Sequence, residues 1–236
     1  MNKKKDTPYY IGLAIIIVIF GVFAVTNVIH YINKDKVVDS NRTENRIPVA
    51  DKFLKKFNKV PDFEFVNQNG DTITNQDLLG KVYVIDFFFT TCPTICTPMS
   101  MNMSKINQAL ENLEDFRTVS ITIDPDNDTP EVLKEYSKKY NANDKWLFLT
   151  GNKDAIYKLS REGFNAYVAE SENESIRFEH SGNFALVDRN GYIRSRKVRI
   201  DEENENWIYH YNGVQENDIP AQIQEIIQDA ETLLNK

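Results

Sequence analysis

The sequence predicts an α/β protein, a mixed sheet flanked by helices, with an N-terminal transmembrane helix. Residues 82–89 are an almost continuous run of β-branched and aromatic side chains, which is typical of a strand buried on both faces. Strand patterns then alternate with helical ones and close on a hairpin, which favours a mixed sheet covered on both faces. Residues 11–32 form an apolar segment long enough to cross a membrane.

The apolar segment follows a cluster of lysines, Lys3 to Lys5. As a helix, residues 11–32 would span about 33 Å, enough for the hydrocarbon core of a bilayer. We see no small-residue cleavage site of the kind a signal peptide has, and no cysteine follows that could direct lipoprotein processing. We therefore expect residues 1–10 to be cytoplasmic and residues 11–32 to form a single-pass anchor in a bacterial-type inner membrane. The rest of the chain would be extracytoplasmic.

The composition after the apolar segment changes twice. Residues 33–46 are polar and charged without an apolar period, and we interpret them as a linker. Residues 47–236 have the composition of a globular domain. The net charge of −7 argues against nucleic acid as a partner, and residues 1–32 add three lysines to a still more acidic domain. Two cysteines in all exclude a disulfide scaffold and a four-sulfur zinc site.

The predicted elements follow from periodicity and turn signals. A small hairpin with its turn at Asn69-Gly70 precedes the buried strand. In the loop 124–130, Asp128 or Thr129 can cap a helix whose first position suits Pro130. The helix after the buried strand has an apolar stripe of Met99, Met103, Ile106, Leu110 and Leu113, and the next has Val132, Leu133, Tyr136 and Tyr140. The other predictions are strands at 118–123, 146–149 and 164–168, a helix at 154–161, a hairpin of 184–187 with 192–198, and a last helix opened by Asp218 and Pro220.

Both cysteines, Cys92 and Cys96, lie where the buried strand turns into a helix. Backbone N–H groups are unpaired there, and the helix dipole favours a thiolate. On one helical turn their Cβ atoms would be about 5–6 Å apart, so both sulfurs could reach one metal ion. The same pair could instead form a disulfide. Pro93 makes the junction stiff.

Two thiolates could hold a soft ion such as Cu(I), and a third, nitrogen ligand would let the site accept Cu(II). Outside the membrane segment the candidate nitrogen ligands are His180 and His210. We expect His180 to lie in a loop that can come round beside the cysteine-bearing strand end, whereas His210, between aromatic residues, suits packing or a surface position. Spacing alone leaves His180 either an exposed side chain or a ligand.

Three phrases, FFFTTCPTIC, SITIDPDNDTPE and EHSGNFALVDRNGYI, occur in this order and resemble the SCO/SenC family of copper-binding proteins. The resemblance implies a thioredoxin-like fold over residues 47–236 and a copper site formed by Cys92, Cys96 and His180. It also implies a role in assembling the dinuclear copper centre of cytochrome c oxidase. Two positions depart from the family pattern: Thr97 stands where the family usually has proline, and Asn127 where it usually has arginine.

We therefore interpret the protein as a membrane-anchored copper chaperone rather than an enzyme. Its partners would be the copper-receiving subunit of a respiratory oxidase, and other copper chaperones or thiol reductants. The alternative is a thiol–disulfide oxidoreductase with Cys92 as the attacking sulfur, although the usual redox spacing is C-x-x-C. A peroxidase lacks an activating cation between Lys81 and Lys105, and structural zinc lacks a fourth ligand. A binding module without chemistry leaves the two cysteines unexplained.

Overall fold

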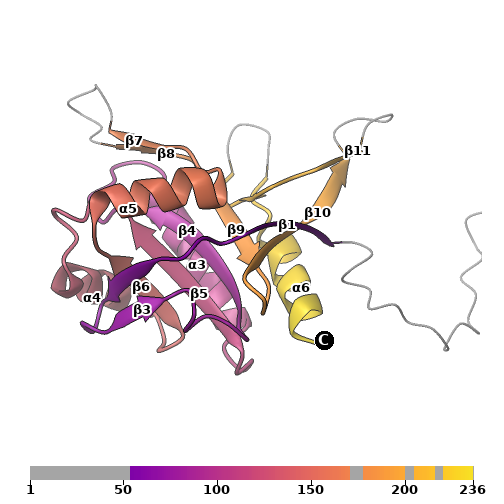
Figure 1. Ribbon diagram of the computed structural model, residues 1–236, viewed down its shortest axis with the longest axis horizontal. Coiled ribbons are helices and arrows are strands. Elements are labelled where there is room, and N and C mark those ends of the chain that lie inside the picture. The colour runs from indigo at the N-terminus through magenta and orange to yellow at the C-terminus, as the bar shows by residue number, and fades with distance from the viewer. Residues whose placement is uncertain (1–53, 171–177, 200–204, 216–219, 236) are drawn as a thin grey trace, which may run out of the picture. The chain divides into compact units, whose positions relative to one another are not determined.

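The computed structural model describes residues 54–170, 178–199, 205–215 and 220–235 (Figure 1). The predicted membrane anchor at 11–32 and the linker at 33–46 lie outside the described residues. Within the described part of the chain, no helix has the length and apolar character needed to cross a bilayer.

In the described residues, the core of the domain is a mixed sheet of ten strands. Strands β4, β5 and β6 run parallel to one another, and the remaining pairings are antiparallel. The main path has the order β1-β10-β9-β4-β5-β6-β2-β3, with β11 paired to β10 and β12 to β9. The strands are β1 (Leu54–Lys59), β2 (Glu64–Asn67), β3 (Thr72–Thr74), β4 (Val82–Phe88), β5 (Phe116–Thr122), β6 (Trp146–Thr150), β9 (Asn183–Val187), β10 (Tyr192–Arg199), β11 (Glu205–Trp207) and β12 (Tyr211–Asn212).

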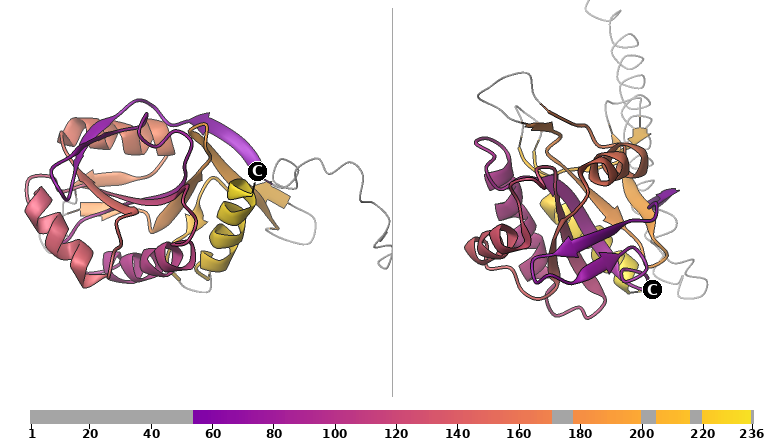
Figure 2. Two further views of the ribbon diagram at one scale, coloured as in Figure 1. Left: turned by 90° about the horizontal axis from the view of Figure 1, so that it is seen from below. Right: turned by 60° about the vertical axis from the view of Figure 1, so that its left-hand side comes forward.

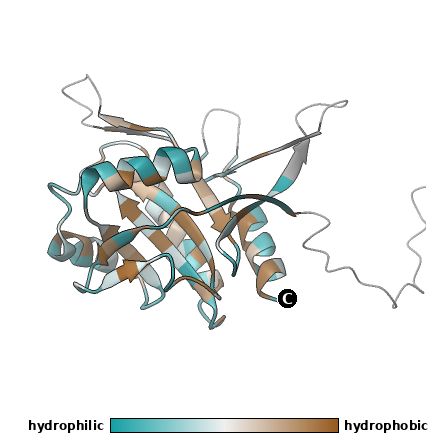
Figure 3. Ribbon diagram, viewed as in Figure 1, coloured by the Kyte–Doolittle hydropathy of each residue, from teal (hydrophilic) through white to brown (hydrophobic). Residues whose placement is uncertain are grey.

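Helices cover both faces of this sheet. Figure 2 shows α5 (Lys153–Lys158) on one face and α3 (Cys96–Ala109), α4 (Pro130–Lys139) and α6 (Ile223–Leu234) together on the other. Every residue of β4 is buried, as expected for a central strand with helices on both sides. In Figure 3 the apolar residues accordingly gather on the central strands, and the outer helical surfaces are polar. The predicted mixed α/β sandwich is confirmed.

Both predicted Asn-Gly turns are present. Gly70 has φ +88° between β2 and β3, and Gly191 has φ +79° between β9 and β10, a backbone conformation that glycine adopts without steric cost. The turn before β10 is closed by the Gly191 N–H, which donates to the Asp188 carbonyl at 2.9 Å. These turns fix the register of the hairpins that flank the central strands.

Several elements differ from the sequence predictions. The edge strand β1 was not predicted. The strand expected at 164–168 is shifted to β7 (Val168–Glu170), and the helix expected at 154–161 is α5 followed by a π-helix, Leu159–Gly163. The last helix begins at Ile223, later than predicted. Val132, expected on the buried face of α4, is 37% exposed.

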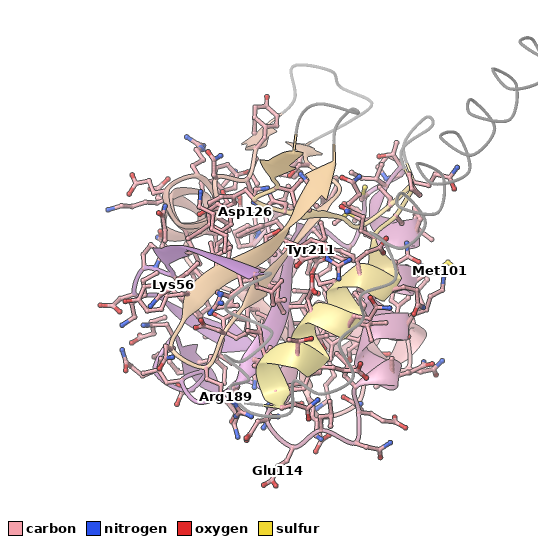
Figure 4. All side chains as sticks on the ribbon, turned by 90° about the vertical axis from the view of Figure 1, so that its right-hand side faces the viewer. Lys56, Met101, Glu114, Asp126, Arg189 and Tyr211 are labelled. Carbon is pink, nitrogen blue, oxygen red and sulfur yellow. The ribbon has the colours of Figure 1, made fainter. Side chains whose placement is uncertain are left out.

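The helix α6 is attached to the sheet through a polar cluster. Asp229 accepts hydrogen bonds from the Arg196 guanidinium at 2.7 Å and from the Tyr211 hydroxyl at 2.7 Å. Burial, and then the negative charge of Asp229, raises the pKa of Tyr211 well above its usual range. Figure 4 shows Tyr211 inside the domain, whereas Met101 of α3 projects from its surface.

Candidate metal centre

The two cysteines lie side by side at the start of α3. The helix begins at Cys96, and its N-cap residue, Ile95, provides no side-chain hydrogen bond to the helix. Instead, the Cys96 N–H donates to the Cys92 Sγ at a distance of 3.4 Å. A helix N-terminus leaves N–H groups unpaired and favours negative charge, so this contact stabilises a Cys92 thiolate. The predicted location of the thiol pair at a strand-to-helix junction is confirmed.

The two thiols have different environments. Cys92 is half-buried, whereas the Cys96 side chain is 1% exposed and belongs to the apolar core. Burial raises the pKa of the Cys96 thiol well above its usual range, and the hydrogen bond and charge of Cys92 raise it further. A hydrogen bond with the Phe89 backbone acts in the opposite direction and lowers this pKa. The expectation that the helix start favours a thiolate therefore does not hold for Cys96 in the metal-free protein, because burial is the larger effect.

A buried carboxylate holds the loop that leads into Cys92. Asp128 is fully buried and accepts a hydrogen bond from the Thr90 N–H at 3.0 Å. The hydroxyls of Thr90 and Thr122 also donate to it. Thr90 is two residues before Cys92, and Thr122 is the last residue of β5. Asp128 thus ties the cysteine loop to the neighbouring strand end with charge-assisted hydrogen bonds.

The loop carrying Asp128 also contains one of the departures from the family pattern. The Asn127 amide donates to Asp128 at 2.8 Å and to the Thr90 hydroxyl at 3.4 Å. The helix cap is provided by Thr129, whose hydroxyl accepts from the Val132 N–H at 3.4 Å. Of the two predicted capping residues, Thr129 caps α4 and Asp128 serves the cysteine loop. Asn127 completes the same polar network without adding a positive charge.

The backbone of His180 lies in a strand, which corrects the prediction of a loop. Strands β7 and β8 (Phe178–His180) form a separate two-stranded antiparallel sheet in which His180 pairs with Val168. The following residue, Ser181, donates its N–H to the Tyr167 carbonyl at 3.2 Å. The next carbonyl, that of Gly182, accepts from the Gly213 N–H at 2.8 Å. The backbone is therefore held at residue 180 and at the two residues that follow it.

An aromatic contact joins this hairpin to the cysteine-bearing strand. The ring centroids of Phe89 and Phe178 are 5.2 Å apart with an interplanar angle of 69°, an edge-to-face arrangement. Both side chains are buried, Phe89 just after the end of β4 and Phe178 at the start of β8. In Figure 1, β4 runs toward the side of the domain on which the β7–β8 hairpin lies. The structure thus brings the segment containing His180 to the cysteine loop.

The remaining candidate, His210, makes packing contacts of its own. Its Nε2 makes a 2.5 Å hydrogen bond with the Phe164 carbonyl, and its ring contacts Tyr209 edge-to-face at 4.8 Å. Burial lowers the pKa of His210, and the hydrogen bond to Phe164 partly offsets this. The packing role predicted for His210 agrees with these contacts.

The family resemblance placed the loop 124–130 near the site, but sequence reasoning did not find the roles of three residues there. Asp128 was interpreted as a cap, and Phe178 was read only as part of the sequence around His180. Lys153 lies outside the segment between Lys81 and Lys105, and its Nζ is 5.6 Å from the Phe178 ring centroid and 3.8 Å from Asp126 Oδ2. Among the described side chains, His, Cys, Asp and Glu form no group of three or more that could hold a metal ion.

Comparison with known proteins identifies the family. The SCO1/SenC family model matches residues 52–209, so the chain belongs to this family. Over 139 residues it is 37% identical to a SCO1 protein homolog of Bacillus subtilis, a match that covers 57% of this chain and 71% of that protein.

Solved structures agree on the fold. A SCO1/SenC family lipoprotein from Bacillus anthracis matches with a TM-score of 0.62 and 33% identity, over 76% of this chain and 97% of that one. BsSco, described as a member of the Sco family of cytochrome c oxidase assembly proteins with a disulfide switch, matches with a TM-score of 0.60 and 31% identity. The match covers 75% of this chain and 93% of BsSco. A copper-bound ScoI from Bradyrhizobium japonicum shares the fold with a TM-score of 0.56 at 21% identity. The match covers 75% of this chain and 99% of that one. The thioredoxin-like arrangement of sheet and helices is therefore confirmed.

Proposed function

We propose that this protein is a copper chaperone that binds one copper ion through Cys92, Cys96 and His180. It would deliver this ion to the dinuclear copper site of a cytochrome c oxidase. Copper is the cargo, and transfer would proceed by ligand exchange, in which an acceptor thiolate or imidazole replaces the protein ligands one at a time. The protein would be anchored by residues 11–32, with its domain on the extracytoplasmic side.

The observation that carries the proposal is that two neighbouring thiols lie close to a strand that contains a histidine. Cys96 N–H to Cys92 Sγ is 3.4 Å, so the two cysteines are close enough to bind one soft ion. The Phe89–Phe178 contact, 5.2 Å between ring centroids, brings the strand that contains His180 to the same loop. The copper-bound ScoI structure with this fold, and the oxidase-assembly description of BsSco, support copper and the oxidase as cargo and acceptor.

Metal binding would reverse the effect of burial on the ionisation of Cys96. In the metal-free protein, burial disfavours the Cys96 thiolate. A bound cation favours deprotonation of its thiol ligands, so loading would release protons and depend on pH. The half-buried position of Cys92 leaves one ligand open to an incoming acceptor group, as ligand exchange requires.

A copper titration of the reduced full-length chain tests the proposal. We expect one equivalent to bind, weaker binding after His180→Ala, and no stoichiometric binding after Cys92→Ser with Cys96→Ser. His210→Gln is the matched control, because it removes the other candidate histidine and should leave the copper affinity unchanged. Binding that is indifferent to His180→Ala would contradict the three-ligand site.

The asymmetry of the two thiols favours a second candidate, a thiol–disulfide oxidoreductase. The Cys92 thiolate would attack a partner's disulfide, and Cys96 would then displace the reduced partner to leave a Cys92–Cys96 disulfide. The two electrons and two protons lost by the dithiol reduce the partner. This reaction should fail after Cys92→Ser and survive His180→Ala, whereas copper binding should be weakened by His180→Ala.

A further inference from the structure

We propose that Phe178 is a positioning residue that fixes the third copper ligand by docking the β7–β8 hairpin onto the cysteine loop. This inference rests on the proposed function, because it concerns the strength and geometry of the same site. It adds a residue that carries no metal-binding group.

The need for such a residue follows from the topology. Strands β7 and β8 form a two-stranded sheet of their own and are not part of the ten-stranded sheet. An isolated two-stranded hairpin is marginally stable in water, so its position depends on the side chains that attach it to the domain. Beyond the backbone hydrogen bond between Gly213 and Gly182 at its base, the hairpin that contains a candidate ligand is therefore fixed by side-chain packing.

Phe178 is suited to this attachment. Its side chain is 4% exposed, and its ring meets the Phe89 ring edge-to-face at 5.2 Å between centroids. Lys153, the first residue of α5, places its Nζ 5.6 Å from the centroid of the same ring, within the range of a cation–π contact. Two elements of the domain, the end of β4 and the start of α5, thus contact one side chain of the hairpin.

The Phe89–Phe178 contact joins two segments that each lie close in the chain to a candidate ligand, the cysteine loop and strand β8. Phe89 is the residue that follows β4, and its carbonyl accepts a hydrogen bond from the Cys92 N–H at 3.3 Å. On the other side, positions 178 and 180 are two apart in one strand and therefore belong to the same face of the hairpin. Val168, the backbone partner of residue 180, is 2% exposed, so the hairpin packs against the core at Val168 as well as at Phe178.

A thermodynamic cycle tests the inference. Copper affinity is measured for the full-length chain with and without Phe178→Leu, in the natural background and in the His180→Ala background. If Phe178 acts through residue 180, Phe178→Leu weakens copper binding roughly two- to tenfold in the natural background, the range expected for an aromatic pair. It should have no effect after His180→Ala.

Controls separate positioning from general stability. Phe116→Leu removes an equally buried aromatic residue at the start of β5, where the Phe116–Val82 pairing lies at the other end of β4, and should leave the copper affinity unchanged. Phe178→Met has about the same volume as leucine but a longer, unbranched side chain that adapts to irregular gaps, so it serves if Phe178→Leu fails to fold, and it should show the same dependence on His180. The Cu(II) spectrum of the Phe178 variants should shift toward that of His180→Ala, a signature that a purely structural role would not produce.

The outcomes distinguish this inference from the proposed function. If His180→Ala weakens copper binding but Phe178→Leu does not, or weakens it equally in both backgrounds, the inference is wrong and the three-ligand site stands. If His180→Ala itself has no effect on copper binding, both the proposed function and the inference are wrong.

Discussion

The two halves of the candidate site are held by different forces. The cysteine loop is fixed by a buried carboxylate, Asp128, which accepts hydrogen bonds from the loop backbone and from two hydroxyls. The histidine hairpin is fixed by backbone hydrogen bonds at its base and by the ring of Phe178. Directional bonds to a charge define one geometry, whereas an aromatic contact tolerates small shifts. The comparison indicates a rigid dithiol beside a hairpin that can shift slightly, which suits the proposed role of holding and releasing copper.

The largest effect is expected from breaking the rigid half. Asp128→Ala leaves several buried donors without an acceptor and should lower the free energy of unfolding by about 3 kcal/mol. Urea denaturation measures this change. Asp126→Ala is the matched control from the same loop, because the side chain of Asp126 is 72% exposed and its loss should change stability by less than about 0.5 kcal/mol. Equal effects of the two substitutions would show that Asp128 does not hold the loop.

The next prediction separates the two thiols within the rigid half. Cys92 is half-buried and accepts a hydrogen bond, whereas Cys96 is buried with a raised pKa. In the reduced, metal-free protein, iodoacetamide should therefore modify Cys92 at least about tenfold faster than Cys96. Mass spectrometry of timed samples gives both rates. The difference should disappear in denaturant, and a faster reaction at Cys96 in the folded protein would contradict the structure.

A third prediction concerns the backbone that supports the hairpin. A Cβ atom added at Gly213 would lie 2.7 Å from the Gly182 carbonyl oxygen and 2.7 Å from the Phe184 ring. Gly213→Ala must therefore shift the segment that follows His180, and we expect a loss of about 1–3 kcal/mol in the free energy of unfolding. Copper affinity should fall as well, because the base of the hairpin moves. Unchanged stability would mean that the close approach of these two backbones is not needed.

The smallest effect is expected from His210, which belongs to neither half. Its pKa in the folded protein is lowered below the usual 6.5, so below that pH the unfolded chain binds more protons than the folded one. The contribution of neutral His210 to the free energy of unfolding is fully present above about pH 6.5. It is lost as the pH decreases toward the pKa of His210 in the folded protein. The stability of His210→Gln should depend less on pH between about 7.5 and 5. An identical pH dependence in both proteins would contradict a buried, neutral His210.

The sequence was sufficient for the features that depend on neighbouring residues. The strand-to-helix junction at Cys92 and Cys96, the buried strand and the Asn-Gly turns all follow from local patterns. The edge strand β1 was missed because Lys55 and Lys56 are both exposed and the strand shows no alternation. The role of Asp128 was missed because its partner Thr90 is 38 residues away in the chain.

The histidine half shows the same limit more clearly. Spacing left His180 open between an exposed residue and a ligand, and the family resemblance selected it. Phe178 could not be recognised as its support, because the contact with Phe89 joins segments that are distant in the sequence. Local signals therefore predicted where the two thiols lie, and tertiary packing determined which residues lie beside them.

Copper K-edge X-ray absorption of the copper-loaded, reduced protein tests the central claim most directly. The three-ligand site predicts two sulfur scatterers and one imidazole, and the imidazole signal should disappear in His180→Ala while both sulfurs remain. A spectrum of sulfur scatterers without imidazole, or an imidazole signal that persists in His180→Ala, would contradict the assignment of His180 as the third ligand.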